Sequence, residues 1–307
     1  MVIETCTQCP RNCRVRREET EGKGFCRMGA LPVVARAALH QWEEPAISGT
    51  RGSGTVFFTG CSLQCVFCQN YSISTRREVG KVVTPRELHD IFLRLIEQGA
   101  HNINLVNPTH FALPIAEALA MEKLPVPVVY NCGGYESLET LQKLEGLVDI
   151  YLPDLKYATD ELGQKYSGAP DYFTRASAAI LEMVRQTGPA RYTDDGMMKS
   201  GTLVRHLILP GNTRNSIAVL HWLHDHLPEN PVSLMSQYVP CGRAEEFPEI
   251  NRTITRREYE KVRDVLFELE LDGYMQGRSA AKKDFIPPFS LEGLDGIGKG
   301  WASSRDS

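Results

Sequence analysis

The chain has 307 residues, of which 42% are hydrophobic and 23% are charged, and its formal net charge is −4 at pH 7. This composition excludes a disordered, collagen-like or coiled-coil structure for most of the chain, and it gives no electrostatic basis for binding nucleic acid or an anionic membrane. No apolar run approaches the roughly 18 residues of a membrane span, and the first residues lack the order of a signal peptide. We therefore expect a cytoplasmic protein, in which the nine cysteines are reduced ligands or nucleophiles rather than disulfides.

Four cysteines, Cys6, Cys9, Cys13 and Cys26, form the first feature along the chain. They lie in a charged, glycine-containing segment that has little hydrophobic periodicity and cannot bury enough apolar surface to order itself. Four thiolates make a closed site, so structural zinc and an auxiliary iron–sulfur cluster are the two metal alternatives, with metal-free thiols as the third. We take residues 1–50 as a Cys-rich N-terminal segment and expect its metal site to be separable from the chemistry of the remaining chain.

A second group of cysteines follows a short strand-like run at residues 55–59. Gly60 ends the run, and Cys61, Cys65 and Cys68 come next with the spacing C-x3-C-x2-C. Three thiolates can bind one face of an iron–sulfur cube and leave one iron open to a substrate or cofactor, whereas a closed cluster or a structural zinc site requires four ligands. The alternatives are a zinc site completed by a distant ligand and three unrelated buried thiols.

Strands and helices alternate along the rest of the chain. Thr84 and Thr255 each begin a capping box, in which Glu follows three residues later, and each precedes a predicted helix. The pattern predicts six β/α units between about Val56 and Leu269, which indicates an α/β fold. Beyond the first strand, the expected strands span residues 102–106, 126–130, 149–155, 203–209 and 232–238, and the expected helices begin near residues 84, 114, 138, 175, 217 and 255.

Polar residues gather where these strands end, and parallel barrels build their sites at the carboxyl ends of strands. Asn107 and His110 follow the second strand, and Asn131 follows the third. His110 is the best site candidate among the histidines by position. These residues predict a polar mouth at one end of the barrel.

Three charged residues are expected to face the interior of the barrel. Asp154 and Lys156 share parity with apolar residues of the fourth strand, and Arg205 does so in the fifth. Inward charges are costly unless they are paired or bind a ligand, and three together suggest recognition of a zwitterion. The alternative is a structural ion pair of Asp154 with Lys156 and an Arg205 on the surface.

The segment from Phe57 to Asn70, with its three cysteines, resembles the radical S-adenosylmethionine (SAM) superfamily, and most closely the pyruvate formate-lyase activating enzyme branch. In that family three thiolates hold a [4Fe-4S] cluster, and the amino and carboxylate groups of SAM chelate the fourth iron. An electron, supplied by a reducing flavodoxin or ferredoxin, releases a 5′-deoxyadenosyl radical from SAM. The resemblance covers about residues 55–275. It implies a partial (β/α)6 barrel over residues 51–275. Residues 276–307 form a C-terminal extension that we expect to be partly disordered, because its end, from about Leu294, is rich in glycine and serine and should be frayed.

The resemblance also implies roles for single residues. The catalytic set is Cys61, Cys65 and Cys68 together with Lys156, which follows Asp154 at the SAM site in a triplet typical of the family. Arg205 corresponds to an arginine that faces the SAM carboxylate. Phe67, the aromatic residue before the third cysteine, corresponds to one beside the adenine.

Other positions depart from the pattern of the activating enzymes. Asn107 stands near the place of a Gly-Gly-Glu segment that binds the SAM amino group, and we expect it to contribute to that contact. Asn131 replaces an aspartate, and Tyr238, preceded by Gln237, replaces a histidine. We therefore include Asn107, Asn131 and Gln237 among the predicted cofactor-binding residues. The string from Trp42 to Gly49 is similar to less characterised, activating-enzyme-like members.

The predicted function is reductive cleavage of SAM followed by abstraction of hydrogen from a protein or peptide, with a glycyl-radical enzyme as one possible substrate. The alternatives are radical chemistry on a small metabolite and a non-catalytic iron–sulfur or zinc protein.

Overall fold

Parallel strands form the main wall of the structure, a computed structural model that describes residues 1–275 and 287–301. One set of strands is hydrogen-bonded in the order β2, β4, β5, β6 and β8, and a second set in the order β9, β10 and β11. The bounds of these strands are β2 Ser53–Phe58, β4 Ile103–Val106, β5 Val128–Cys132, β6 Ile150–Pro153, β8 Met198–Thr202, β9 Val204–Leu207, β10 Val232–Met235 and β11 Gly273–Met275.

The two sets of strands meet at the end of β6. The Leu155 N–H donates to the Arg205 carbonyl at 2.9 Å, and Asp154 forms an isolated parallel bridge with Arg205. Only Leu203 separates β8 from β9, so the wall continues from one set into the other. Strands β2, β4, β5, β6, β9 and β10 therefore follow one another in space as they do in the chain. The predicted α/β fold with a partial (β/α)6 barrel is confirmed.

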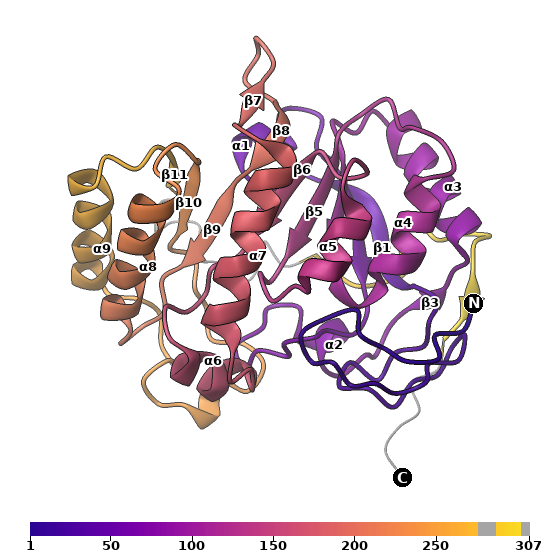
Figure 1. Ribbon diagram of the computed structural model, residues 1–307, viewed down its shortest axis with the longest axis horizontal. Helices are drawn as coiled ribbons and strands as arrows, with labels where there is room; N and C mark the ends of the chain where they lie inside the picture. The colour runs from indigo at the N-terminus through magenta and orange to yellow at the C-terminus, as the bar shows by residue number, and fades with distance from the viewer. Residues whose placement is uncertain (276–286, 302–307) are drawn as a thin grey trace.

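Six helices complete the predicted β/α units, and Figure 1 shows four of them, α3, α4, α5 and α7, as a layer in front of the sheet. In the first of them, Leu88, Ile91, Phe92 and Leu95 recur at helical spacing and are all buried, so the helix packs one apolar face against the core. The bounds of the six helices are α3 Pro85–Glu97, α4 Ala112–Leu119, α5 Leu138–Leu144, α7 Tyr172–Thr187, α8 Thr213–His226 and α9 Arg256–Glu268.

Several elements outside these units were not predicted. Strand β1 pairs antiparallel with β2 and brings part of the segment 1–50 into the sheet, while the proposed boundary after residue 50 stays a prediction. Most of β1 is buried, so it lacks the alternation of apolar and polar residues that marks a strand. The α-helices and strands that were not predicted are β1 Val33–His40, α1 Pro45–Ser48, α2 Tyr71–Ser74, β3 Lys81–Val82, α6 Asp160–Ser167, β7 Arg191–Tyr192, β8 Met198–Thr202, β11 Gly273–Met275 and β12 Lys299–Gly300.

Part of the predicted C-terminal extension packs against the barrel. Leu294 and Ile297 are buried in the same core as α3, and β12 pairs with β3. The glycine-rich composition there had indicated a frayed end, because isolated apolar residues in such a stretch carry no periodic signal. Residues 276–286 and 302–307, which the prediction of partial disorder includes, lie outside the described residues.

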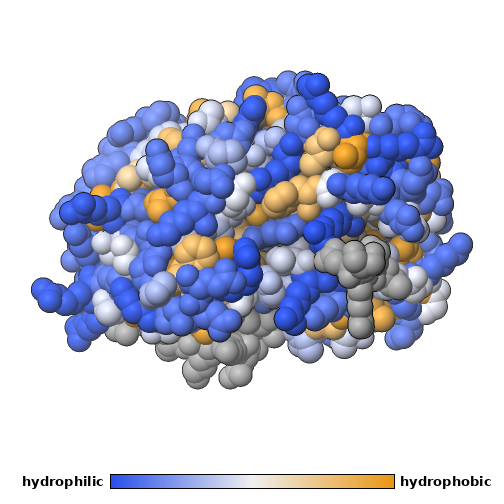
Figure 2. Space-filling view, turned by 90° about the horizontal axis from the view of Figure 1, so that it is seen from below, coloured by the Kyte–Doolittle hydropathy of each residue, from blue (hydrophilic) through white to orange (hydrophobic). Residues whose placement is uncertain are grey.

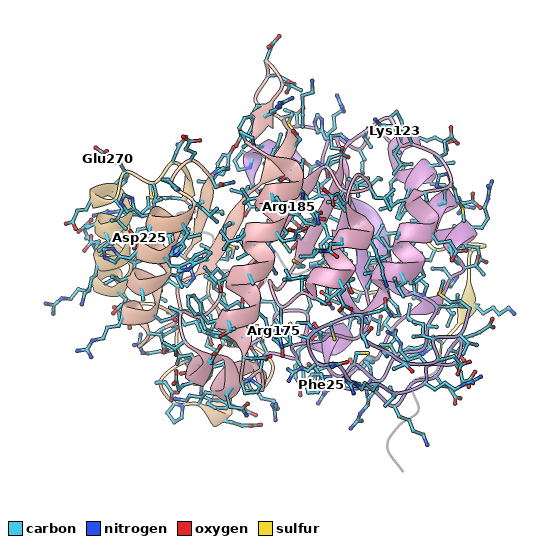
Figure 3. All side chains as sticks on the ribbon, viewed as in Figure 1. Phe25, Lys123, Arg175, Arg185, Asp225 and Glu270 are labelled. Atoms are coloured by element: carbon cyan, nitrogen blue, oxygen red, sulfur yellow. The ribbon has the colours of Figure 1, made fainter. Side chains whose placement is uncertain are left out.

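The carboxyl ends of the strands point to one end of the molecule. In Figure 1 the arrow of β5 points down, toward α2 and the indigo N-terminal segment. Figure 3 shows Phe25 of that segment at the lower end and Lys123, which precedes β5, at the upper end. The face seen from below in Figure 2 is mostly hydrophilic, with small hydrophobic areas between the polar ones. Within the described part of the chain, none of the helices has the length and apolar character needed to cross a membrane.

The capping box at the start of α3 gives a test of the fold. The Thr84 hydroxyl accepts from the Glu87 N–H at 3.2 Å, and the Glu87 carboxylate accepts from the Thr84 N–H at 2.7 Å. We expect Thr84→Ala to lower the free energy of unfolding by about 1 kcal/mol, because one N–H of the first turn loses its acceptor. Urea unfolding followed by circular dichroism measures this change, and Thr84→Ser is the matched control. Equal stability of the alanine variant and the wild type would contradict the role of the cap.

Candidate functional site

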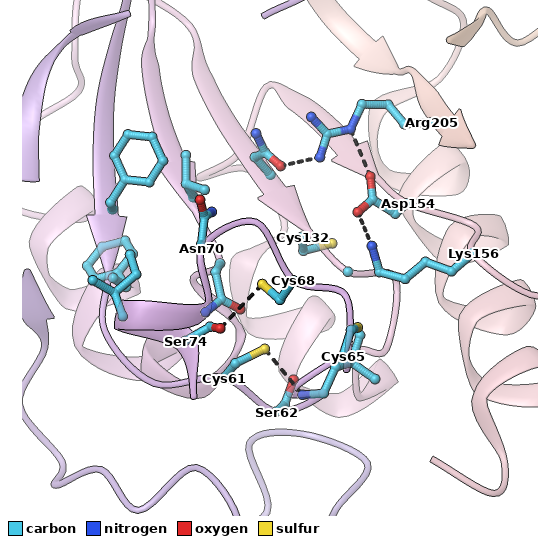
Figure 4. Close-up of a pocket in the computed structure, with 18 residues that line it drawn as sticks. Cys61, Ser62, Cys65, Cys68, Asn70, Ser74, Cys132, Asp154, Lys156 and Arg205 are labelled. Carbon is cyan, nitrogen blue, oxygen red and sulfur yellow. Dashed lines mark hydrogen bonds and ion pairs between the residues drawn. The ribbon is translucent and has the colours of Figure 1, made fainter. Parts of the chain in front are cut away.

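One cavity of about 150 Å³ lies where the barrel strands end. Figure 4 shows the loop that carries the three cysteines on one side of it and Arg205, Asp154 and Lys156 on the other. The structure thus brings together eight of the predicted site residues, which come from the loop after β2 and from four further strands, β4, β5, β6 and β9, or the residues directly after them. The predicted residues that line the cavity are Cys61, Cys65, Cys68, Asn107, Asn131, Asp154, Lys156 and Arg205.

The cysteine loop is positioned by a glycine and an asparagine. Gly60 has φ of +85°, and a Cβ atom there would lie 2.4 Å from Cγ of Met28. Only glycine fits this turn, because both the backbone conformation and the space exclude a side chain. The Asn107 side chain donates a hydrogen bond to the Gly60 carbonyl, so it fixes the start of the loop. We predicted that Asn107 binds cofactor; the structure gives it this positioning contact at the edge of the cavity.

Each of the three sulfur atoms accepts a hydrogen bond. The donors come from three different segments, namely the loop itself, α2 and the end of α6, and such bonds stabilise thiolate sulfur. In chain order the bonds run from the Leu63 N–H to Cys61 Sγ (3.3 Å), from the Ser167 hydroxyl to Cys65 Sγ (3.0 Å) and from the Ser74 hydroxyl to Cys68 Sγ (3.3 Å).

Burial makes these thiols depend on a bound cation. It raises the pKa of Cys61 to about 11 and that of Cys68 to about 12. Both groups would therefore carry a proton at neutral pH in the absence of metal, and metal binding would displace it. The donor set fits iron and sulfide, which bind thiolate.

The arrangement of the sulfur atoms also bears on which metal they suit. Within residues 1–275 and 287–301, no three His, Cys, Asp or Glu side chains are arranged to hold one metal ion. In an iron–sulfur cube each thiolate binds a different iron atom, so its sulfur atoms lie farther apart than those around one zinc ion. The number of thiolates on the loop, three, matches an open cluster and falls short of the four ligands of a structural zinc site.

Asp154 is the centre of a buried chain of ion pairs. It accepts from Nε of Arg205 at 2.9 Å and from Nζ of Lys156. Arg205 also donates to Asn131 at 2.6 Å and to Glu43 at 3.3 Å. The ion pair between Asp154 and Lys156 that the structural alternative required is present, but Arg205 joins the same group instead of lying on the surface.

The charges in this group hold one another in the ionised state. Burial would raise the pKa of Asp154, but Arg205 and Lys156 hold it below its usual value. Burial would likewise lower the pKa of Lys156, and the adjacent Asp154 carboxylate raises it above its usual value. Both cations are therefore fully charged at neutral pH beside the cavity.

Glu43 is a site residue that sequence reasoning missed. It precedes α1, accepts from Arg205 at 3.3 Å and from the Asn131 amide at 3.4 Å, and burial raises its pKa to about 7. The string from Trp42 to Gly49 had been noted only for its family resemblance. The two adjacent glutamates in this mostly apolar string indicated that one carboxylate could be buried. No neighbouring residue indicated that Arg205 would be its partner.

Two predicted cofactor-binding residues do not line the cavity. Phe67 is buried against Tyr166 and Tyr238, with ring centroids 6.3 and 5.9 Å away. The Gln237 amide donates weakly to Met235 Sδ, and its Oε1 is a buried acceptor that no donor reaches in the described part of the chain. Their contacts with a cofactor stay predictions.

His110 also lies away from the cavity, and burial lowers its pKa to about 3. Its Nε2 lies 2.8 Å from the Thr59 carbonyl and so carries the proton. The residue is a neutral structural histidine in this structure, which does not support the role suggested by its position.

Comparison with known proteins relates this chain to a superfamily of proteins and to one similar protein. The family model for the radical SAM superfamily matches residues 55–223. The chain is 30% identical over 281 residues to an uncharacterized protein of Methanocaldococcus jannaschii, and the match covers 88% of this chain and 77% of that protein.

The fold is similar to solved structures at low sequence identity. Streptococcus suis SuiB, solved with S-adenosylmethionine bound, matches 71% of this chain with a TM-score of 0.50 and 15% identity. The match covers 45% of SuiB, so this chain spans less than half of its length. A domain of a pyruvate-formate lyase-activating enzyme from Bacteroides vulgatus matches 63% of this chain and 91% of its own, with a TM-score of 0.37 and 17% identity. The first similarity supports the fold; the second leaves the predicted branch a prediction.

Proposed function

The chain belongs to the radical SAM superfamily, and from this membership we propose that it cleaves SAM reductively at a [4Fe-4S] cluster held by Cys61, Cys65 and Cys68. When bound, the cluster supplies one electron to the sulfonium of SAM, which yields methionine and a 5′-deoxyadenosyl radical. The observation that carries the proposal is one shared cavity, on which the three thiols of the cysteine loop face the paired cations Lys156 and Arg205. A fourth thiol, Cys132, also lines this cavity, but it lies at the end of β5 and outside the loop.

The cations keep hydrogen-bond donors available for a ligand. Each nitrogen of the Arg205 guanidinium donates one bond within the site, and its two terminal nitrogens have one further N–H each. Lys156 uses one of its three N–H groups on Asp154. We propose that these remaining donors bind the carboxylate of SAM, while Asp154 and Asn131 hold the two side chains in place.

The substrate is proposed to be a protein or peptide, with a glycyl-radical enzyme as one candidate. The cavity of about 150 Å³ is smaller than the roughly 300–1,000 Å³ typical of small-molecule sites, so a bound cluster and SAM would leave no room inside it for a second small molecule. A substrate would then meet the radical at the mouth, which a segment of a larger molecule can reach. Radical chemistry on a small metabolite is the alternative, and it would require a larger closed space.

The proposal includes an electron donor and a cellular location. A reducing flavodoxin or ferredoxin would supply the electron, and a cytoplasmic protein would keep its thiols reduced. No disulfide joins any of the nine cysteines.

The direct test is anaerobic reconstitution with iron and sulfide, followed by addition of SAM and dithionite. We expect 5′-deoxyadenosine and methionine in equal amounts, measured by liquid chromatography. Reconstituted protein that is reduced, as judged by its electron paramagnetic resonance (EPR) spectrum, and still leaves SAM intact would refute the proposal.

The hydroxyl of Ser167 is expected to set the reduction potential of the cluster. We expect Ser167→Ala to make this potential more negative, because hydrogen bonds to cluster sulfur favour the reduced state. Ser177→Ala is the matched control, since its hydroxyl bonds to carbonyls of its own helix. A redox titration followed by EPR decides the matter, and identical potentials in both variants would exclude the role of Ser167.

A further inference from the structure

Residues 1–27, here called the N-terminal lobe, have thiols inside and apolar side chains outside. Cys6 and Cys26 are buried, whereas Val2 and Phe25 are 41% and 38% exposed. The lobe contains turns and isolated bridges, with no helix or extended strand in residues 1–27. Burial of apolar surface therefore contributes little to its order, and another cross-link must stabilise it.

The backbone of the lobe is strained next to its cysteines. Asn12 and Arg14, on either side of Cys13, have φ of 44° and 54°, and Arg27, which follows Cys26, has φ of 53°. Residues with a side chain adopt this left-handed conformation at a cost, and it persists where the surrounding structure requires it. These residues flank Cys13 and follow Cys26, so the strained turns fix the backbone beside two of the four cysteines.

The four cysteines lie on adjoining turns of the lobe. The Arg14 N–H donates to the Cys6 carbonyl at 3.0 Å and the Asn12 N–H to the Cys9 carbonyl at 3.0 Å, so both cysteines lie beside the turn that carries Cys13. The Phe25 N–H donates to Cys13 Sγ at 3.3 Å. The thiols thus form one group with donors directed at it.

Arg17 supplies a second and independent observation. Its side chain is almost fully buried, and it donates to the carbonyls of Met28, Gly29 and His110 and to Cys6 Sγ at 3.6 Å. Among the described residues, none of the acceptors of these bonds is a carboxylate. A buried cation without an opposite charge is costly, so its contact with Cys6 indicates negative charge on the thiol group.

From these observations we propose that Cys6, Cys9, Cys13 and Cys26 hold a second, closed iron–sulfur cluster whose negative charge is balanced by Arg17. Four thiolates around a [4Fe-4S]²⁺ core give a net charge of about −2, which supplies the missing partner of Arg17. Of the two metal centres that four thiolates can hold, only the cluster is redox-active, and Arg11, which lies between Cys9 and Cys13, contacts Ser62 beside Cys61, so a cluster here would lie next to the barrel loop. Unlike the barrel loop, the set offers four thiolates, so no iron remains open to SAM.

Arg11 docks the lobe on the barrel loop. It lies between Cys9 and Cys13 and donates to the carbonyls of Ser62 at 2.7 Å and Ser167 at 2.8 Å. In return, the Gln64 amide of the loop donates to the Phe25 carbonyl at 2.9 Å. The lobe and the loop are therefore in direct contact, and a truncation through Cys26 would disturb both. Substitutions test the separability predicted from the sequence more cleanly than deletion.

The test compares iron, sulfide and zinc in three anaerobically reconstituted full-length proteins. We expect about eight iron atoms per chain in the wild type and about four in both Cys61→Ala/Cys65→Ala/Cys68→Ala and Cys9→Ser/Cys13→Ser. SAM should change the EPR spectrum of the second variant and leave that of the first unchanged. Cys241→Ala, which lies outside both sets, is the control and should bind as much iron as the wild type.

The outcomes separate this proposal from the proposed function. Four irons in the barrel-loop variant support the second cluster whether or not the wild type cleaves SAM. Zinc in place of iron in that variant, or the wild-type iron content in Cys9→Ser/Cys13→Ser, would overturn the proposal. If the barrel-loop variant fails to fold, as judged by circular dichroism, the iron content of Cys9→Ser/Cys13→Ser decides it.

Discussion

Replacement of Cys61, Cys65 and Cys68 together by alanine is expected to abolish the release of 5′-deoxyadenosine from SAM. The rate should fall to that of the uncatalysed reaction, a loss of at least about 10⁶-fold if typical enzymatic accelerations apply. The physical reason is that these three thiols lie on one loop at the cavity, each with its own hydrogen-bond donor, so their loss leaves Cys132 as the one cysteine among the residues that line it.

The assay uses reduced, reconstituted protein and liquid chromatography of the nucleoside product. Cys241→Ala is the matched control because it also removes a thiol, and it should retain the wild-type rate. Release of 5′-deoxyadenosine by the triple variant at the wild-type rate would contradict the assignment of the loop.

Removal of the charge of Lys156 should weaken SAM binding with a limited effect on stability. We expect Lys156→Met to weaken the free energy of SAM binding by about 1–3 kcal/mol, because a charge-assisted contact with the carboxylate is lost. This corresponds to a rise in the Kd for SAM of roughly 5- to 150-fold. Asp154 retains its 2.9 Å bond to Arg205 in this variant, so no buried charge is left without a partner.

Arg205→Met should weaken SAM binding by a similar factor and also destabilise the fold. This variant removes the positive charge that pairs with the Glu43 and Asp154 carboxylates, and breaking a buried ion pair from one side costs about 3–5 kcal/mol.

Lys165→Met is the matched control for loss of a positive charge. Lys165 forms an exposed pair with Glu249, and such pairs contribute about 0–1 kcal/mol. Anaerobic calorimetric titration with SAM measures all three variants. If the Kd for SAM is unchanged in both Lys156→Met and Arg205→Met, these two residues have a purely structural role.

The parts of the fold that were predicted from the sequence have local signals. The capping boxes at Thr84 and Thr255 are both present, because the residues that form each box lie within one helical turn. Asp154 and Arg205 were both predicted to face the barrel interior because each alternates with apolar neighbours in its own strand, and they are bridge partners in the structure. The side of the sheet that a residue faces is set by the pleat of a single strand, so it can be predicted locally.

The parts that were missed depend on contacts between distant segments. Glu43 meets Arg205 across 162 positions, and Arg11 meets Ser167 across 156, and no residue near either one indicates its partner. Leu294 is buried although its glycine-rich surroundings resemble a frayed end. Such contacts are set by the packing of the whole chain, which local periodicity does not encode.

The central claim is that the loop of three cysteines leaves one iron open to SAM, and electron–nuclear double resonance tests it most directly. The reduced full-length protein would be mixed with SAM labelled with ¹⁵N in the amino group and ¹⁷O in the carboxylate. We predict hyperfine coupling of both labels to the cluster spin, with both couplings lost in the Cys61→Ala/Cys65→Ala/Cys68→Ala variant. A reduced cluster that binds SAM without coupling to either label, or couplings that persist in the triple variant, would contradict the account.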